Sequence, residues 1–420
     1  MEHYSIVLFI LALLIGLSAV ADRIRIPYPV LLVIAGMTIG FIPVFPNIEL
    51  MPEVVFLIFL PPMLYDSAFN ISFREFRTNL NTITTLSISL VFTTVVGIAV
   101  IARYCIPGMT WPLSFVLGAI LSATDAVAAM SVTKGLNLSH KTVTILEGES
   151  LINDASALVA YRFAVAAVTG STFVLWKASL DFALLLVGGI VIGVIIGRLL
   201  SFMLLKLRHN TMVLVSLLLL MPFVTYLFAE EIEVSGVIAV VTLGLVISQH
   251  AKRSFPEHIK RESKSIWDII IFLLNGLVFI LIGIQFPFVV RSIDHAKILP
   301  YIGYALLIWF VTLLIRIVRV FLQQRNLLQA FQKGKRRVSE DALLDFKNSV
   351  IISWSGMRGI VSLAVAIGLP VTLADGTAFP QRSAIIFISV VVVLLTLIGQ
   401  GLTLPWLVKL LKMEDTRIDV

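Results

Sequence analysis

Residues 383–408 read SAIIFISVVVVLLTLIGQGLTLPWLV and contain no charged side chain. A run of about 20 apolar residues is what a helix needs to cross the hydrocarbon core of a bilayer. Similar stretches recur along the chain, which has 59% hydrophobic and 14% charged residues, against about 45–50% and about 25% in soluble domains. A water-soluble fold could not bury this much apolar surface in 420 residues. The sequence therefore predicts an all-α polytopic membrane protein.

Hydropathy, interrupted by Pro, Gly and clusters of charge, predicts about 13 transmembrane helices. Their approximate bounds are 4–21, 28–45, 53–69, 80–102, 112–133, 142–168, 179–204, 211–229, 234–249, 266–290, 298–321, 348–369 and 383–408. The first stretch lacks a basic leader and a cleavage site of small residues, so we expect a retained helix rather than a signal peptide.

Lysine and arginine concentrate in one alternate set of loops. This set contains Arg23, Arg25, Arg74, Arg77, Lys134, Lys141, Lys206, Arg208, Lys252, Arg253, Lys260, Arg261, Lys264 and the basic run 333–337. The positive-inside rule places these loops in the cytoplasm, with the N-terminus outside and the C-terminus inside. The net charge of +7 then reflects topology, and we expect no nucleic-acid partner.

An odd number of helices allows two inverted repeats, helices 1–6 and 8–13, joined by helix 7. Secondary transporters use this plan and place their sites at mid-membrane on interrupted helices. Helices 5 and 12 match in the two halves, and each carries a charge among small residues, in the stretches 122–125 (SATD) and 355–359 (SGMRG). We expect Asp125 to offset the positive helix ends at such a break, and Arg358 the negative ends.

Ionisable groups inside the bilayer cost about 2.5–3.5 kcal/mol each on insertion scales, so each needs a reason. Four lie several residues from any predicted interface: Asp125, Glu149, Asp154 and Arg358. Three others lie toward the ends of predicted spans, where their heads can reach water: Arg198, Arg316 and Arg319. Asp66, near the cytoplasmic end of helix 3, is either a gate or a structural group.

Helix 6 carries two polar stripes. Ser150 and Asp154 are four residues apart and share one face, and Glu149 and Asn153 form the neighbouring stripe. Hard oxygen ligands of this kind suit an alkali cation, whereas the lone Cys105 and scattered histidines suggest no softer metal. Burial disfavours an ionised carboxylate and a bound cation favours it, so one carboxylate can hold either H⁺ or Na⁺. Such competition, coupled to alternating access, is sufficient for exchange without a cofactor.

Glu149 and Arg358 are expected to form a buried ion pair that fixes helix packing, an interpretation compatible with transport. A cation channel is the main alternative class, although no filter-like repeat is evident. The sequence has no G-x-x-x-x-G-K-[ST] run for a pump and no H-E-x-x-H for a protease. We therefore expect a transporter rather than an enzyme.

Four motifs are similar to those of one known family: FLPPMLYDSAFN (59–70), SATDAVA (122–128), LEGESLINDASALV (146–159) and SGMRGIVSLAVA (355–366). In order and spacing the chain resembles the cation:proton antiporters, which include prokaryotic NhaP-type exchangers and eukaryotic sodium/proton exchangers. The resemblance covers essentially the whole chain.

This resemblance implies a site at the crossing of unwound helices 5 and 12. By analogy, the residues around the ion and proton would be Asp154, Asp125, Thr124, Ser150, Asn153 and Glu149, with Na⁺ held by Asp154, Asp125, Ser150 and Thr124. The resemblance also implies exchange of cytoplasmic Na⁺ or Li⁺ for external H⁺, with K⁺/H⁺ exchange as the alternative. Because the family's asparagine–aspartate version is associated with electroneutral exchange, a one-to-one ratio is expected.

The family fold implies a multi-pass homodimer in the cell membrane that serves pH homeostasis. Residues 1–420 would form one transmembrane domain, with dimer-domain helices at about 1–70 and 211–290 and a linking helix at about 179–204. Core-domain helices would lie at about 80–168 and 298–411. Two positions depart from the family pattern and put local geometry in question: Ala126 replaces the usual Pro, and Ala155 the usual Gly.

Overall fold

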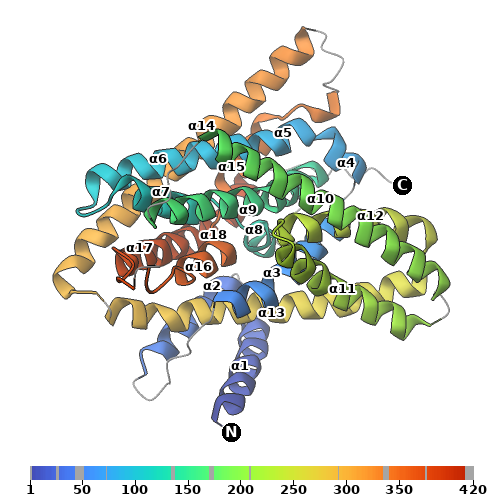
Figure 1. Ribbon diagram of the computed structural model, residues 1–420, viewed down its shortest axis with the longest axis horizontal. Helices are drawn as coiled ribbons and strands as arrows, with labels where there is room; N and C mark the ends of the chain where they lie inside the picture. Colours follow the sequence, from blue (N-terminus) through green and yellow to red (C-terminus); the bar gives the residue numbers. More distant parts are fainter. Residues whose placement is uncertain are drawn as a thin grey trace. The chain divides into compact units, whose positions relative to one another are not determined.

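The computed structural model describes residues 2–24, 28–42, 52–71, 73–133, 138–169, 175–207, 210–291, 293–333, 340–373 and 376–411. Within these ranges the chain is almost entirely helical (Figure 1), and the only β feature is an isolated bridge between Thr372 and Ala378. The prediction of an all-α protein is confirmed. Parts of the predicted cytoplasmic loops, including the basic residues 335–337, lie outside the described residues.

The helices follow one another along the chain with short connections. The α-helices are α1 (Glu2–Ile24), α2 (Tyr28–Gly40), α3 (Pro52–Asn70), α4 (Phe73–Thr78), α5 (Leu80–Thr84), α6 (Leu90–Cys105), α7 (Trp111–Ile120), α8 (Ala126–Val132), α9 (His140–Val168), α10 (Leu175–Lys206), α11 (Thr211–Glu231), α12 (Gly236–Ser254), α13 (Glu257–Arg291), α14 (His295–Gln332), α15 (Phe346–Trp354), α16 (Ile360–Ile367), α17 (Arg382–Leu394) and α18 (Gly401–Leu410). Two π-helical turns, η1 (Thr85–Ser89) and η3 (Leu395–Gln400), and one 3₁₀ turn, η2 (Glu340–Ala342), complete the described elements.

Membrane-spanning length is evident in much of the described chain. Seven continuous helical stretches there are long and apolar enough to cross a bilayer, and shorter apolar helices accompany them. The predicted spans 112–133 and 348–369 are absent from the seven because each is broken into two short helices. The total of thirteen spans therefore stays a prediction.

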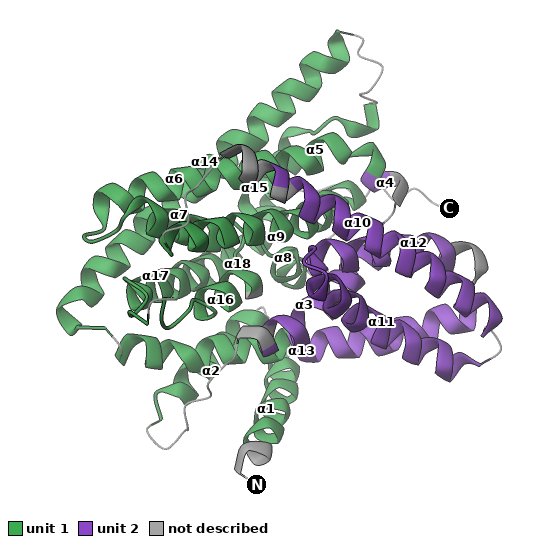
Figure 2. Cartoon of the chain, in the orientation of Figure 1, with its two compact units in different colours: residues 1–49, 77–170, 275–420 green, residues 50–76, 171–274 purple. Residues whose placement is uncertain are grey.

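The chain divides into two compact units (Figure 2). Unit 1 comprises residues 1–49, 77–170 and 275–420, and unit 2 comprises 50–76 and 171–274. In unit 2, α3 packs closely on α12, where the Ser248 hydroxyl donates to the Phe69 carbonyl at 2.6 Å. The buried Tyr65 ring lies 5.1 Å from the Trp267 ring in the same unit. Unit 1 contains both broken helices.

The breaks occur where the sequence places polar and small residues. Helix α7 ends at Ile120 and α8 begins at Ala126, so residues 121–125 are not helical. Helix α15 ends at Trp354 and α16 begins at Ile360, which leaves 355–359 unwound. Interrupted helices were expected at both places, and the structure confirms them.

Helix α14 is longer than hydropathy predicts. It continues from the predicted end near residue 321 to Gln332. Beyond that predicted end, Leu327 is buried in an apolar cluster with Leu344, Ile352 and Leu146. This packing fixes the end of α14 against helices that carry the site, and it places Arg316 inside the protein rather than at an interface.

Candidate functional site

The two unwound segments lie against each other and are joined through their backbones. The Asp125 N–H donates to the Met357 carbonyl at 2.7 Å. The Ser362 hydroxyl donates to the Ala123 carbonyl at 3.4 Å. Each break thus supplies a partner for polar backbone groups that the other exposes, as a low-dielectric interior requires. The expected crossing of the two unwound helices is confirmed.

Charged side chains occupy the helix ends at this crossing. Asp125 is the N-cap of α8, and its carboxylate accepts a hydrogen bond from the Ala128 N–H at 3.1 Å. Arg358 is buried, and its guanidinium donates to the carbonyl of Leu121, at the end of α7, and to that of Gly356. Negative charge at a helix start and positive charge at a helix end are both favourable. The geometry agrees with what the sequence predicts for Asp125 and Arg358.

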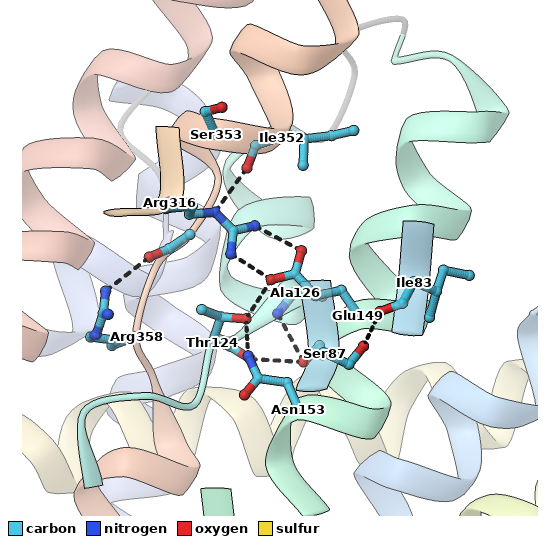
Figure 3. A network of polar contacts seen from close by, with 12 residues as sticks. Ile83, Ser87, Thr124, Ala126, Glu149, Asn153, Arg316, Ile352, Ser353 and Arg358 are labelled. Carbon is cyan, nitrogen blue, oxygen red and sulfur yellow. Dashed lines mark hydrogen bonds and ion pairs between the residues drawn. The ribbon is translucent and has the colours of Figure 1, made fainter. Parts of the chain in front are cut away.

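Thr124 is the centre of a polar network with α9 (Figure 3). The Asn153 side-chain amide donates to the Thr124 hydroxyl oxygen at 2.8 Å, and that hydroxyl donates to Glu149 Oε1 at 3.4 Å. The Ser150 hydroxyl donates to the Thr124 carbonyl at 2.9 Å. Both polar stripes of α9 therefore contact the first break, and they fix the backbone and the side chain of Thr124.

Glu149 has a different partner from the one predicted. Its carboxylate accepts two hydrogen bonds from the guanidinium of Arg316, one to Oε1 and one of 2.8 Å to Oε2 (Figure 3). Arg316 Nε also donates to the Ile352 carbonyl at 3.0 Å. The expected pair of Glu149 with Arg358 is wrong, because Arg358 is engaged by backbone carbonyls at the crossing. The expectation that Arg316 reaches water is also wrong, since only 4% of this residue is exposed.

Asp154 is buried beside this network and lacks a full set of protein partners. Only 7% of the residue is exposed, and within the described residues its Oδ1 atom has no hydrogen-bond partner. Asp125 lies close enough for the two carboxylates to interact electrostatically. Leaving a buried polar atom unpaired costs about 1–3 kcal/mol. A proton or a cation at this oxygen would remove that cost.

The two departures from the family pattern are accommodated. Ala126 occupies the first position of α8, and its N–H donates to the Ser150 hydroxyl oxygen at 3.3 Å, a bond that proline could not make. Ala155 is a buried residue inside α9, where alanine is a good helix former.

Two glycines allow the crossing to close. A β-carbon at Gly359 would lie 2.6 Å from the β-carbon of Asp125 and closer still to its carboxylate. A β-carbon at Gly356 would lie 2.5 Å from Arg316 Nε. These distances are too short for any side chain, so the GMRG stretch keeps room for Asp125 and Arg316.

The predicted gate residue Asp66 belongs to unit 2 rather than to the unit that holds the crossing. It is half-buried on α3, and its carboxylate accepts a hydrogen bond from the Asn70 amide at 2.9 Å. The structure thus gives Asp66 a local partner, and its role as a gate stays a prediction.

Sequence reasoning missed two residues at the crossing, Arg316 and Thr396. The Arg358 N–H donates to the hydroxyl of Thr396 at 3.1 Å, and Thr396 lies in the π-helical turn η3. The available signal for Arg316 was its position five residues inside the predicted span 298–321. Thr396 offered only a hydroxyl within a long apolar run, although π-turns often mark functional sites.

Comparison with known proteins adds a family to this geometry. The family model described as "Sodium/hydrogen exchanger, transmembrane" matches residues 9–410. A "Sodium, potassium, lithium and rubidium/H(+) antiporter" of Bacillus pumilus is 36% identical over 422 residues, which are 97% of this chain and 61% of that protein. The "Low-affinity Na(+)/H(+) antiporter NhaS1" of Synechocystis is 35% identical over 97% of this chain and 74% of its own. The chain therefore spans about three-fifths to three-quarters of these relatives.

A solved structure gives the same fold. The sodium proton antiporter MjNhaP1 from Methanocaldococcus jannaschii superimposes with a TM-score of 0.72 at 19% identity. The match covers 98% of this chain and 100% of that one. At this identity the likeness concerns the architecture of the helices.

Proposed function

Because this chain belongs to the transmembrane sodium/hydrogen exchanger family, whose members are transporters rather than enzymes, we propose that it exchanges Na⁺ or Li⁺ from the cytoplasm for external H⁺ by alternating access. One observation carries the proposal. Asp154 is buried beside two broken helices with an unpaired carboxylate oxygen. That oxygen can bind a proton or a cation but not both together, so whichever ion occupies it is carried when the site changes sides.

The cation ligands in this proposal are Asp154, Asp125, Ser150 and Thr124. Support comes from the network that fixes Thr124, since Ser150 and Asn153 hold its carbonyl and hydroxyl. A carboxylate and neutral oxygens held at fixed positions suit a small dehydrated alkali cation. In this arrangement Asn153 and Glu149 orient the ligands.

The charges around the crossing favour exchange of one cation for one proton. The charged groups there are the carboxylates Asp125, Glu149 and Asp154 and the guanidinium groups Arg316 and Arg358. With all of them ionised, a single negative charge remains. One Na⁺ or one H⁺ neutralises it, and a site that is neutral in both loaded states crosses the membrane field without moving net charge.

Exchange of K⁺ is the second candidate. It is favoured by the Bacillus relative, whose name includes potassium and rubidium. The ligand types are the same for both ions, so the choice depends on the size of the cavity and on the energy of dehydration.

The wider architecture in this proposal is the one that the resemblance implies. We propose a homodimer in the cell membrane that serves pH homeostasis, with thirteen helices in two inverted repeats and the dimer-domain and core-domain division given above. The N-terminus would lie outside and the C-terminus in the cytoplasm. In this architecture Asp66 acts as a gate through its partly buried carboxylate.

Proteoliposomes containing a trapped pH dye test the proposal. Adding Na⁺, Li⁺ or K⁺ in turn should move protons in the opposite direction, and Asp154→Asn should abolish this movement while the protein still folds. A valinomycin-clamped potential should not drive net exchange when the Na⁺ and pH gradients are zero. Substantial flux through the Asp154→Asn variant would refute the role of Asp154, and potential-driven current without a proton countermovement would indicate a channel.

A further inference from the structure

We infer that residue 126 sets the cation affinity of the site, because its backbone N–H occupies the Ser150 oxygen that the cation would use. The inference rests on the proposed function, in which Ser150 is a ligand. It concerns the backbone of residue 126 rather than its methyl group.

The hydroxyl of Ser150 already makes two hydrogen bonds. It donates its hydrogen to the Thr124 carbonyl at 2.9 Å, and its oxygen accepts from the Ala126 N–H at 3.3 Å. A hydroxyl oxygen has two lone pairs, so one remains for a cation. The donating bond also fixes the orientation of the hydroxyl, which prevents it from turning both lone pairs toward an ion.

The Ala126 N–H competes directly with a cation. It places a partially positive hydrogen at the oxygen that a positive ion must approach. Asp125 does not relieve this, because its carboxylate accepts from the N–H of Ala128, two residues further on. Removing the N–H of residue 126 would free a lone pair of Ser150 and lessen the repulsion.

Proline is a suitable residue to remove that N–H. Position 126 is the first residue of α8, where the N–H has no partner within the helix and proline is well tolerated. Asp125, the preceding residue, has φ −108° and ψ 103°, the extended conformation that a residue before proline adopts. Ala126→Pro therefore deletes the bond to Ser150 while the backbone keeps its path.

The test measures apparent KM for Na⁺ and Vmax together in proteoliposomes. A neutral hydrogen bond contributes about 0.5–1.5 kcal/mol, so Ala126→Pro should lower the KM by about twofold to tenfold. A variant that only damages packing would lower Vmax or protein yield and would not lower KM. If the proline variant fails to fold, lactic acid at position 126 removes the N–H as a backbone ester while keeping the methyl group, and the same fall in KM is expected.

Ser150→Ala provides the control. In that background Ala126→Pro should leave the KM where Ser150→Ala alone puts it, because the competing oxygen is gone. The inference is overturned if the proline or ester variant transports with an unchanged or raised KM, or if its effect persists without Ser150. Absence of cation-dependent proton movement in the unmodified chain would overturn the proposed function instead, and this inference with it.

Discussion

The buried pair of Glu149 and Arg316 gives the most quantitative prediction. Glu149→Gln leaves the Arg316 guanidinium in place, 4% exposed, with its Ile352 contact but without a compensating charge. Breaking a buried ion pair from one side typically costs about 3–5 kcal/mol. If each kcal/mol shifts the midpoint by about half of the 2–4 °C seen in 150–250-residue domains, the fall in Tm is roughly 5–10 °C.

The assay is thermal unfolding of the purified protein, followed by intrinsic fluorescence. A double-mutant cycle combines Glu149→Gln with Arg316→Met and compares it with each single change. Residues that contact each other show coupling of about 0.5–3 kcal/mol, and the double variant should recover part of the loss. Glu257→Gln is the matched control, because that carboxylate belongs to an exposed pair with Lys260 on α13 and should have no measurable effect.

A second cycle distinguishes the two arginines near the crossing. Glu149→Gln combined with Arg358→Met should be closer to additive, because Arg358 donates to carbonyls rather than to Glu149. The reasoning fails if the coupling with Arg358 is the larger one. It also fails if Glu149→Gln leaves the Tm unchanged.

Three further predictions concern the crossing and the exchange itself. Gly359→Ala should abolish transport and lower the Tm, because the added methyl would overlap the Asp125 carboxylate; normal flux through a stable variant would contradict this. Thr396→Val leaves the Arg358 N–H unpaired and should cost about 1–3 kcal/mol, seen as a lower Tm and an altered KM. Thr396→Ser should restore both, and Thr312→Val should change little, since the Thr312 hydroxyl donates within its own helix. Exchange plotted against pH should be bell-shaped, since protons displace Na⁺ at low pH and are too scarce at high pH; its acid limb should move to lower pH as Na⁺ rises, and a limb that ignores Na⁺ would exclude competition.

The sequence was sufficient to locate the crossing, because charge inside an apolar span is costly and therefore informative. Asp125 and Arg358 stood among small residues at matching places, and simple electrostatics predicted which helix ends they would meet. Their hydrogen bonds to the Ala128 N–H and to the Leu121 carbonyl agree with that reasoning.

The partner of Glu149 could not be predicted in the same way. Arg316 was judged by its distance from the end of a hydropathy segment, but α14 continues past that end and packs Leu327 into an apolar cluster. Depth in the protein is therefore not the same as distance along a span. Thr396 was missed because a π-turn changes which residues share a face, and its position depends on tertiary contacts that no local pattern records.

The backbone contact between the two breaks has a consequence for how the chain is made. Helices α7, α8, α15 and α16 are each far shorter than the roughly 20 residues that hold a segment across a bilayer. The Leu121 carbonyl waits for an arginine that lies 237 residues later in the chain, and the Asp125 N–H waits for Met357. Until the ribosome has delivered that second segment, the first break has polar backbone groups without their final partners in lipid, where each costs several kcal/mol. The core of the early half is therefore completed after synthesis of the late half, and chains truncated before residue 357 should be substrates for membrane quality control.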